Sequence, residues 1–315
     1  MPEARHRIEV AAAVIHDAAG RFLLAQRPPG KAFEGYWEFP GGKVEPGEST
    51  AAAMCRELHE ELGITVDTVH PWLTRDFEYP HASVRLRFFR VYAWRGEPHG
   101  REGQQFSWQT PNAISVAPIL PANDPILRAL TLPDVYGITQ ATAMGIGAFN
   151  IQLAAALANG LRLIQVREKT MPPGDLRQFA AHVVAQAHQH GAHVLINGDV
   201  QLARDVGADG VHLTSAQLQS LTQRPDCAWV AASCHSHADI EAATRLGVDF
   251  AVAGPVAATP THPHAPLLGW DGFTQCIADT AIPVYALGGM RIKDVPTARQ
   301  KGAQGVAMLR GAWQR

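Results

Sequence analysis

Apolar positions divide the chain into two regions with different periodicities. In the first region, apolar stretches and turn residues surround a single helical pattern over residues 49–62. In the second region, short apolar runs alternate with helix-like segments such as 176–190 and 240–246. Short apolar runs bounded by turn residues favour buried strands, whereas longer amphipathic windows favour helices. The pattern therefore predicts two domains, 1–131 and 132–315.

Strands dominate the predicted N-terminal domain. Apolar runs at 10–15 and 22–26 flank the turn Asp17-Ala18-Ala19-Gly20, which predicts a hairpin. Further strands are expected over about 64–79 and 84–95. The segment "LPANDPILRAL" predicts a loop followed by a short closing helix. Strands of this kind around one helix predict an α+β fold with a mixed sheet.

The predicted helix of this domain has clear boundaries. Ser49 is a suitable N-cap, and Gly63 stands just past the last apolar position. One face is apolar and is expected to pack on the sheet. Its residues are Ala51, Cys55, Leu58 and Leu62.

The second region contains eight apolar runs that look like strands. They read "DVYGIT", "LRLIQVR", "HVLIN", "DGVHL", "WVAAS", "DFAVAG", "IPVYAL" and "QGVAML". Helical patterns separate most of them. Eight such units within residues 132–315 predict an α/β barrel of the TIM type, with eight parallel strands.

Composition excludes several classes of partner. Of the 315 residues, 46% are hydrophobic and 18% charged, which is enough apolar material for real cores. The net charge is −2 and the pI about 6.7, so the chain offers no basic surface for nucleic acid or for a membrane. The run Val10–Ile15 is far too short to span a membrane. Small molecules are the expected partners, and homo-oligomer formation stays open.

Cysteine usage indicates a reducing compartment. The four cysteines are scattered, and none forms a CxxC pair. This spacing argues against a disulfide framework and against a zinc knuckle. The histidine clusters "HSH" and "HPH" have no cysteine or carboxylate at ligand spacing, so they do not indicate zinc either. We therefore expect a cytoplasmic location.

Three glutamates crowd one face of the predicted helix. At 100° per residue, Glu60 lies about 60° to one side of Glu57, and Glu61 lies about 40° to the other. Like charges at this spacing cost a few tenths of a kcal/mol per pair. A cation among them would turn this cost into an attraction. The alternative is an acidic face that is merely solvated.

The spacing around these glutamates resembles the complete Nudix box, G-x5-E-x7-R-E-U-x-E-E-x-G-U, from Gly42 through Glu48 to Ile64. The resemblance implies hydrolysis of a nucleoside diphosphate linked to another group, with Mg²⁺ or alternatively Mn²⁺ neutralising the phosphate oxygens. It implies that Arg56 orients the glutamates and that Glu48 supports them. The implied metal ligands are Gly41, Glu57, Glu60, Glu61 and Glu102. Glu102 could also serve as the base, or be an ordinary loop glutamate.

Within that family, "EFPGGK", "GEPHGREGQ" and "LPANDP" resemble the MutT branch, over nearly all of residues 5–131. The branch implies hydrolysis of 8-oxo-dGTP to 8-oxo-dGMP and pyrophosphate, which cleanses the nucleotide pool. An alternative is another pyrophosphate, for example a thiamine-related one. The resemblance implies purine contacts from Arg27, Glu38, Phe39, Tyr79 and Asn123. Of these, Asn123 is the sharpest prediction, since an amide can donate and accept at once.

Residues 134–313 resemble the thiamine phosphate synthase/TenI superfamily, through segments such as "LIQVREKTMP" and "ALGGM". The synthase pattern has metal-binding carboxylates where this chain has Gly198 and Gln217, and a lysine where it has His262. Without those carboxylates, tight Mg²⁺ binding is not expected. "NG" at 197–198 is closer to TenI, the thiazole tautomerase branch, whose reaction needs an acid/base group instead of a metal.

His235 in "SCHS" matches the candidate histidine of that branch and has a suitable pKa range. It could instead be a surface or capping residue. The predicted ligand is a small thiazole- or thiamine-related phosphate. The residues expected around it are Gln165, Arg167, Lys169, Asn197, Gly288 and Gly289. The two glycines could instead form mere turns, and the charges could be plain surface residues. The barrel could also be a non-catalytic ligand sensor or scaffold.

Overall fold

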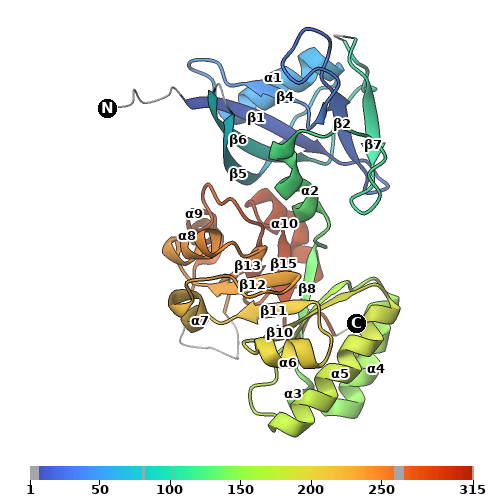
Figure 1. Ribbon diagram of the computed structural model, residues 1–315, viewed down its shortest axis with the longest axis vertical. Helices are drawn as coiled ribbons and strands as arrows, with labels where there is room; N and C mark the ends of the chain where they lie inside the picture. The colour runs from blue at the N-terminus through green and yellow to red at the C-terminus, as the bar shows by residue number, and fades with distance from the viewer. Residues whose placement is uncertain (1–6, 80–81, 102, 259–265, 314–315) are drawn as a thin grey trace. The chain divides into compact units, whose positions relative to one another are not determined.

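A computed structural model describes residues 7–79, 82–101, 103–258 and 266–313 (Figure 1). The chain divides into two compact units, Met1–Thr131 and Leu132–Arg315. Each unit has its own hydrophobic core, and each is described by itself. Within the described ranges, no helix has the length and apolar content that a membrane crossing requires.

The first unit is built from two small sheets. One has the strand order β4-β1-β6-β5 and the other β3-β2-β7. Strand β1 pairs parallel with β6, whereas the remaining pairs are antiparallel, which confirms the mixed α+β fold. The strands are β1 (Arg7–Ile15), β2 (Phe22–Gln26), β3 (Trp37–Glu38), β4 (Gly41–Lys43), β5 (His70–Tyr79), β6 (Ala82–Val91) and β7 (Phe106–Gln109).

The prediction that β1 and β2 form a hairpin is wrong, except for the turn and one pair of bridged residues next to it. The turn forms, with the N–H of Asp17 donating to the Arg21 carbonyl at 3.0 Å. His16 and Phe22 then make one isolated antiparallel bridge. Beyond it the strands separate into different sheets, because β4 and β6 occupy the two edges of β1.

The next two strands are shorter than the sequence predicts. Strand β5 begins at His70 and strand β6 ends at Val91. Outside them, Thr65 and Arg95 pair in an isolated antiparallel bridge. The closing segment matches the prediction, with a 3₁₀ turn η1 (Pro121–Asn123) followed by helix α2 (Asp124–Leu130).

Helix α1 (Thr50–Leu62) has the predicted caps. The Ser49 hydroxyl accepts a hydrogen bond from the Ala52 N–H at 3.1 Å, and Gly63 ends the helix in the left-handed region with φ 67°. Leu58 and Leu62 are fully buried in the core that α1 shares with β1. Burying each such leucine stabilises the fold by roughly 1.5–3 kcal/mol. This burial determines which face of the helix packs on the core and which face remains outside. That outer face carries Arg56 and the glutamates.

The second unit is a closed barrel, as the eight apolar runs predict. Its strands pair parallel in the order β10-β11-β12-β13-β14-β15-β8-β9. They are β8 (Val135–Ile138), β9 (Leu163–Val166), β10 (His193–Asn197), β11 (Gly210–Leu213), β12 (Trp229–Cys234), β13 (Phe250–Ala253), β14 (Val284–Leu287) and β15 (Gly305–Met308).

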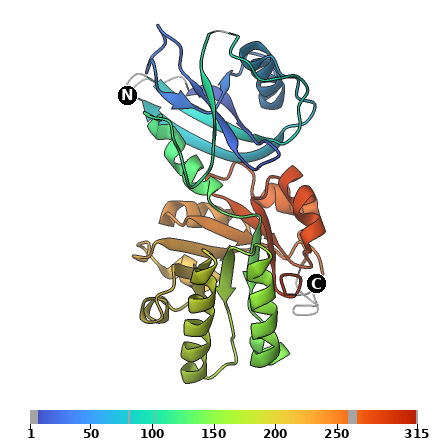
Figure 2. The same ribbon diagram turned by 90° about the vertical axis from the view of Figure 1, so that its right-hand side faces the viewer.

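Helices surround the barrel on the outside, and α4 and α5 lie side by side in both views (Figures 1 and 2). Their lengths follow the apolar periodicity, and α5 covers the predicted segment 176–190 to within a few residues. The helices are α3 (Ala141–Met144), α4 (Ile146–Ala158), α5 (Pro173–Gln189), α6 (Val200–Asp205), α7 (Ser215–Ser220), α8 (His237–Leu246), α9 (Gly269–Cys276), η2 (Ile292–Asp294) and α10 (Val295–Gln300).

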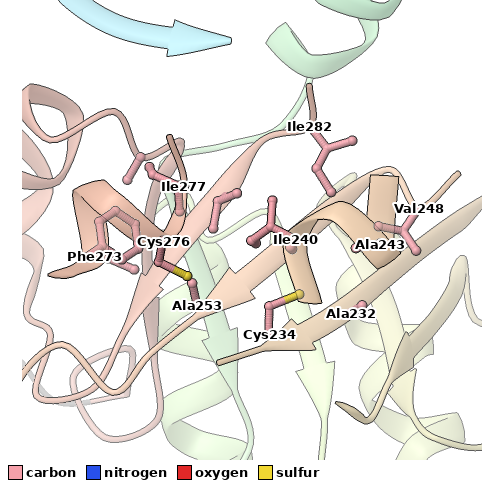
Figure 3. Packing of buried hydrophobic residues seen from close by; sticks show 14 of the residues in the cluster. Ala232, Cys234, Ile240, Ala243, Val248, Ala253, Phe273, Cys276, Ile277 and Ile282 are labelled. Atoms are coloured by element: carbon pink, nitrogen blue, oxygen red, sulfur yellow. The ribbon is translucent and has the colours of Figure 1, made fainter. Parts of the chain in front are cut away.

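The barrel has an inner and an outer core. Inside, the rings of Tyr136, Phe250 and Tyr285 contact one another with centroids 5.4–5.8 Å apart. Outside, α8 and α9 pack on the strands, with Cys234 and Cys276 among the apolar side chains (Figure 3). Burial raises the pKa of the Cys276 thiol to about 11 and that of Cys234 further. Both thiols are therefore packing residues at neutral pH.

Candidate functional site

The Gly41–Gly42 backbone brings two glutamates of α1 to one short strand. A Cβ at Gly42 would lie 2.2 Å from the carboxyl carbon of Glu57, so only glycine leaves room for that carboxylate. A Cβ at Gly41, whose φ is 151°, would meet the Ala11 carbonyl oxygen at 2.1 Å. The Gly41 N–H also donates to Glu61 Oε2 at 3.3 Å. Glu57 and Glu61 therefore converge on β4.

Arg56 connects three carboxylates in this area. Its Nη2 donates to Glu48 Oε1 at 2.7 Å and to the Lys43 carbonyl at 3.1 Å. Its Nη1 donates to Glu57 Oε1 at 2.9 Å and to Glu60 Oε2 at 3.1 Å. One planar guanidinium thus fixes residues that come from β4, from α1 and from the loop between them.

The hydrogen bonds of this network also set its charges. The hydrogen bonds that Arg56 donates to Glu48 and Glu57 raise the pKa of Arg56, and the bond to Glu48 lowers the pKa of that carboxyl. Exposure differs between the glutamates, since the side chain of Glu57 is 15% exposed and that of Glu60 57%. Glu57 is held in place, whereas Glu60 extends into solvent with room to change its rotamer.

The carboxylate oxygens on this face suit a hard divalent cation, although they are not yet arranged around a common point. Across the described residues, no group of three or more His, Cys, Asp or Glu side chains is arranged to hold a metal ion as it stands. Glu57 and Glu60 instead share Arg56. Carboxylate oxygens are nevertheless the ligands that Mg²⁺ and Mn²⁺ prefer, and two of them already meet at β4. Glu102, the fourth predicted carboxylate, lies outside the described residues.

Arg27, Glu38 and Tyr79 come together on another part of the unit, as the sequence predicts. Arg27 Nη1 donates to Glu38 Oε1 at 2.6 Å. Burial nevertheless raises the pKa of Glu38, because desolvation outweighs the attraction of Arg27. Burial and the nearby Glu38 charge also raise the pKa of Tyr79. The three side chains form a half-buried polar group beside aromatic rings.

Asn123 has a buried amide without a hydrogen-bond acceptor. The residue is 5% exposed, and Nδ2 has no hydrogen-bond partner in the part of the chain that the structure describes. The residue stands at the N-cap of α2, yet its side chain makes no capping bond. The preceding segment runs along β3, since Leu120 N–H donates to the Trp37 carbonyl at 3.0 Å. Asn123 is therefore held close to the strand that carries Glu38.

Phe39 contributes to the core. It is 3% exposed, and its ring lies 5.7 Å from that of Phe22 and 5.8 Å from that of Phe88. Little of the ring remains open to a ligand, so a contact with the purine stays a prediction.

The residues that we expect to bind a ligand in the barrel lie at the carboxyl ends of its strands. Gln165 is 2% exposed and donates from Nε2 to Asn197 Oδ1 at 3.1 Å. Arg167 is half-buried, and desolvation lowers its pKa. Lys169, two residues further on, is exposed. Arg167 and Lys169 follow the carboxyl end of β9, the end at which barrel enzymes bind their ligands, and their contact with a ligand stays a prediction.

His235 follows strand β12 at the same end. Its Nδ1 lies 2.9 Å from the Gly254 carbonyl, which can only accept, so Nδ1 carries the proton. Nε2 of the neutral ring then presents a lone pair. The backbone N–H of His235 donates to Asp239 Oδ2 at 2.9 Å, which fixes the residue at the start of α8. This arrangement leaves Nε2 as the proton-accepting atom.

An amide occupies the place of one metal carboxylate in the synthase pattern. Gln217 Nε2 donates to the Gly198 carbonyl at 2.6 Å, and its Oε1 accepts from the Thr214 N–H at 3.0 Å. A carboxylate could not donate the first of these bonds. Asp199, which keeps its carboxylate, caps α6 by accepting from the Leu202 N–H at 2.8 Å. The loops after β10 and β11 are thus joined by hydrogen bonds. His262 lies outside the described residues.

Gly288 and Gly289 form the turn after β14. Their φ values are 108° and 69°. A Cβ at Gly288 would come within 2.8 Å of Pro255, so the turn packs against the segment after β13. The glycines therefore have a packing reason, and a phosphate contact remains a prediction.

Two features of these regions were not predicted from the sequence. His212, 1% exposed, bonds through Nδ1 to the Tyr136 hydroxyl at 3.2 Å and through Nε2 to Ser233 Oγ at 2.9 Å. Burial, aided by Arg167, lowers the pKa of His212 to about 3. The second feature is Phe33, an aromatic residue inside a Gly/Pro-rich loop with a φ of 59°. An aromatic side chain in such a loop was the available signal.

The two units place the chain among proteins that join an α+β phosphate-chemistry domain to an α/β barrel. The NUDIX domain model matches residues 5–130, and the model for thiamine monophosphate synthase, TMP-TENI, matches residues 135–312. The chain belongs to both families, one for each unit.

Relatives match the two units separately. An 8-oxo-dGTP diphosphatase from Haemophilus influenzae is 40% identical over 123 residues, which make up 39% of this chain and 90% of the relative. A CTP pyrophosphohydrolase from Escherichia coli is 39% identical over 122 residues, 39% of this chain and 90% of the relative. A thiamine-phosphate synthase from Thioalkalivibrio sulfidiphilus is 31% identical over 190 residues, 58% of this chain and 89% of the relative.

Proposed function

We propose that the N-terminal unit is a Mg²⁺-dependent nucleoside triphosphate pyrophosphohydrolase with 8-oxo-dGTP as its preferred substrate. The observation that carries the substrate assignment is the buried Nδ2 of Asn123, which lacks an acceptor within the described ranges. A buried donor without a partner costs about 1–3 kcal/mol, so a ligand oxygen at this place is the simplest reason for it. The 40% identity to an 8-oxo-dGTP diphosphatase supports the same substrate.

In the proposed reaction, water attacks the β-phosphorus, and the bond from that phosphorus to the oxygen bridging to the α-phosphorus breaks. The nucleoside monophosphate leaves, and pyrophosphate takes up the oxygen of the water. A bound Mg²⁺ would neutralise phosphate oxygens and favour ionisation of the attacking water. Glu57, Glu60 and Glu61 would hold the cation, with the Gly41 carbonyl and Glu102 as further ligands.

The remaining residues position these groups. Arg56 keeps the Glu57 carboxylate against β4, and Glu48 anchors Arg56 from the other side. Glu60 bonds to Arg56 here, and its 57% exposed side chain would have room to turn from Arg56 towards a bound cation. Asn123 donates from Nδ2 to a carbonyl oxygen of the oxidised guanine, and Arg27, Glu38 and Tyr79 line the base site.

A second substrate class competes with this one. The CTP pyrophosphohydrolase is nearly as similar in sequence, at 39% identity, so identity alone does not select the base. The attached barrel motivates a thiamine-related pyrophosphate as a third substrate. Measuring kcat/KM of the full chain for 8-oxo-dGTP, dGTP, CTP and thiamine pyrophosphate, with and without Mg²⁺, ranks them. A value for 8-oxo-dGTP below that for CTP or thiamine pyrophosphate would refute the proposed preference.

For the barrel we propose binding of a thiazole- or thiamine-related phosphate without a metal, and proton transfer by His235 as in a thiazole tautomerase. The hydrogen bonds of Gln217 support the absence of a metal, and the lone pair on His235 Nε2 supports the proton transfer. Tautomerase turnover of the full chain, compared with that of His235→Ala, tests the catalytic part. Absence of turnover in the wild type, together with phosphate-ligand binding, would instead favour a sensor or scaffold.

A further inference from the structure

Phe33 has an unusual backbone and an unusual exposure. Its φ is 59°, in the left-handed region that bulky residues rarely adopt, and 38% of the residue is exposed. A strained backbone conformation that the surrounding structure maintains is often found at functional sites, and here it carries an exposed phenyl ring.

Hydrogen bonds of the loop between β2 and β3 impose this conformation. Arg27 N–H donates to the Tyr36 carbonyl at 2.8 Å, and Gly35 N–H donates to the Arg27 carbonyl at 3.1 Å. Arg27 Nε reaches into the loop and donates to the Ala32 carbonyl at 2.6 Å. Tyr36 N–H donates to the Phe33 carbonyl itself at 3.1 Å. The backbone of the loop that carries Phe33 is therefore fixed in part by the same arginine that bonds to Glu38.

Aromatic residues from two segments surround this ring. The centroid of the Phe33 ring lies 5.7 Å from that of Tyr36, with an interplanar angle of 71°. It lies 5.7 Å from the centroid of the Tyr79 ring, with an interplanar angle of 48°. Tyr79 in turn lies 4.7 Å from Phe77. The charge of Glu38 contributes to the raised pKa of Tyr79, so the aromatic group borders the Arg27–Glu38 pair. A flat apolar surface next to a polar pair suits the face and the edge of a nucleobase.

We propose that Phe33 is a base-stacking residue that, together with Tyr79, selects a purine over a pyrimidine. The inference rests on the proposed nucleotide hydrolysis and adds a residue that ranks its substrates. Stacking on aromatic side chains is a recurrent way of binding bases, and the larger purine surface gains more from it. Arg27 connects the two parts of the site, because it holds the Phe33 loop and bonds to Glu38.

Phe33→Asn and Phe33→Gly test the proposal, because both remove the ring while both new residues tolerate a positive φ. We expect kcat/KM for 8-oxo-dGTP to fall roughly 5- to 150-fold, equivalent to about 1–3 kcal/mol per stacked base, mainly through KM. The ratio of kcat/KM for 8-oxo-dGTP to that for CTP should fall as well. Phe33→Trp should restore the wild-type value to within about threefold. Leu221→Ala, a residue of equal 38% exposure in the barrel, is the matched control and should change nothing.

Equilibrium binding of 8-oxo-dGMP to the full chain accompanies the kinetics. An unchanged KM and an unchanged dissociation constant in Phe33→Asn, with active wild-type protein, would overturn the role of Phe33 and leave the proposed hydrolysis intact. A wild type that neither binds 8-oxo-dGMP nor hydrolyses 8-oxo-dGTP would overturn both. Equal losses for 8-oxo-dGTP and CTP would refute the selection of purines. A raised thermal midpoint in Phe33→Gly would show that the loss of binding does not come from unfolding.

Discussion

Replacing Asn123 by leucine should stabilise the free protein and weaken nucleotide binding at the same time. The residue is 5% exposed, and its Nδ2 has no acceptor within the described residues. Leucine has nearly the same shape and carries no donor, so Asn123→Leu removes a desolvated group without opening a cavity. The same change removes the donor that we assign to the base.

The magnitudes follow from the burial. An unsatisfied buried donor costs about 1–3 kcal/mol, which is the expected gain in the free energy of unfolding of the N-terminal unit. For a unit of this size, each kcal/mol moves the melting temperature by roughly 3–6 °C. Losing one hydrogen bond to the base should raise KM for 8-oxo-dGTP by about 10-fold or more, since 1.4 kcal/mol corresponds to a factor of ten.

Scanning calorimetry of the full chain, together with KM for 8-oxo-dGTP, measures both effects. Asn150 on α4 of the barrel provides the matched control, because its Oδ1 is also buried and has no hydrogen-bond partner among the residues that the structure describes. Asn150→Leu should stabilise the barrel and leave KM unchanged. A loss of stability in Asn123→Leu would show that Nδ2 has an acceptor in solution, and an unchanged KM would refute its role in base binding.

Three further changes test other parts of the account. Gln217→Glu keeps the acceptor for Thr214 but loses the donor to Gly198, so the melting temperature of the barrel should fall by an amount equivalent to about 1 kcal/mol. Burial lowers the pKa of His212 to about 3, so the unfolded chain binds a proton that the folded barrel does not. Through His212, stability should therefore decrease by up to about 1.4 kcal/mol per pH unit as the pH falls from about 6.5 towards 3. In urea titrations His212→Gln should remove this contribution and leave that of carboxylates with a lowered pKa, such as Asp209. Arg56→Lys cannot bond to Glu48 and Glu57 as a fork, so activity should fall about 10- to 100-fold with little change in secondary structure by circular dichroism.

The boundaries of α1 and the existence of the eight barrel strands could be predicted from the sequence, because local physics determines them. Ser49 and Gly63 cap α1 through bonds within a few residues, and the barrel strands are contiguous apolar runs. The partners of β1 could not be predicted in the same way. Its pairing with β6 joins segments far apart in the chain, and competition for the edges of β1 displaces β2.

The candidate site shows the same limit. The spacing of the glutamates placed them on one face of α1, but the four-way bonding of Arg56 depends on where β4 lies. Gln217 could be read as a lost metal ligand, whereas its bond to the Gly198 carbonyl needs two loops in space. His212 and Phe33 were missed, because burial and a positive φ leave only weak marks in a sequence.

Glu57→Gln tests the central claim most directly, since glutamine keeps the size of the side chain and removes one charged cation ligand next to Gly42. The measurement is kcat of the full chain for 8-oxo-dGTP at saturating Mg²⁺. We expect kcat to fall by about 10²–10³-fold in a protein that still melts at the wild-type temperature. Turnover of the glutamine variant at the wild-type rate would mean that the acidic face of α1 does not hold the catalytic cation.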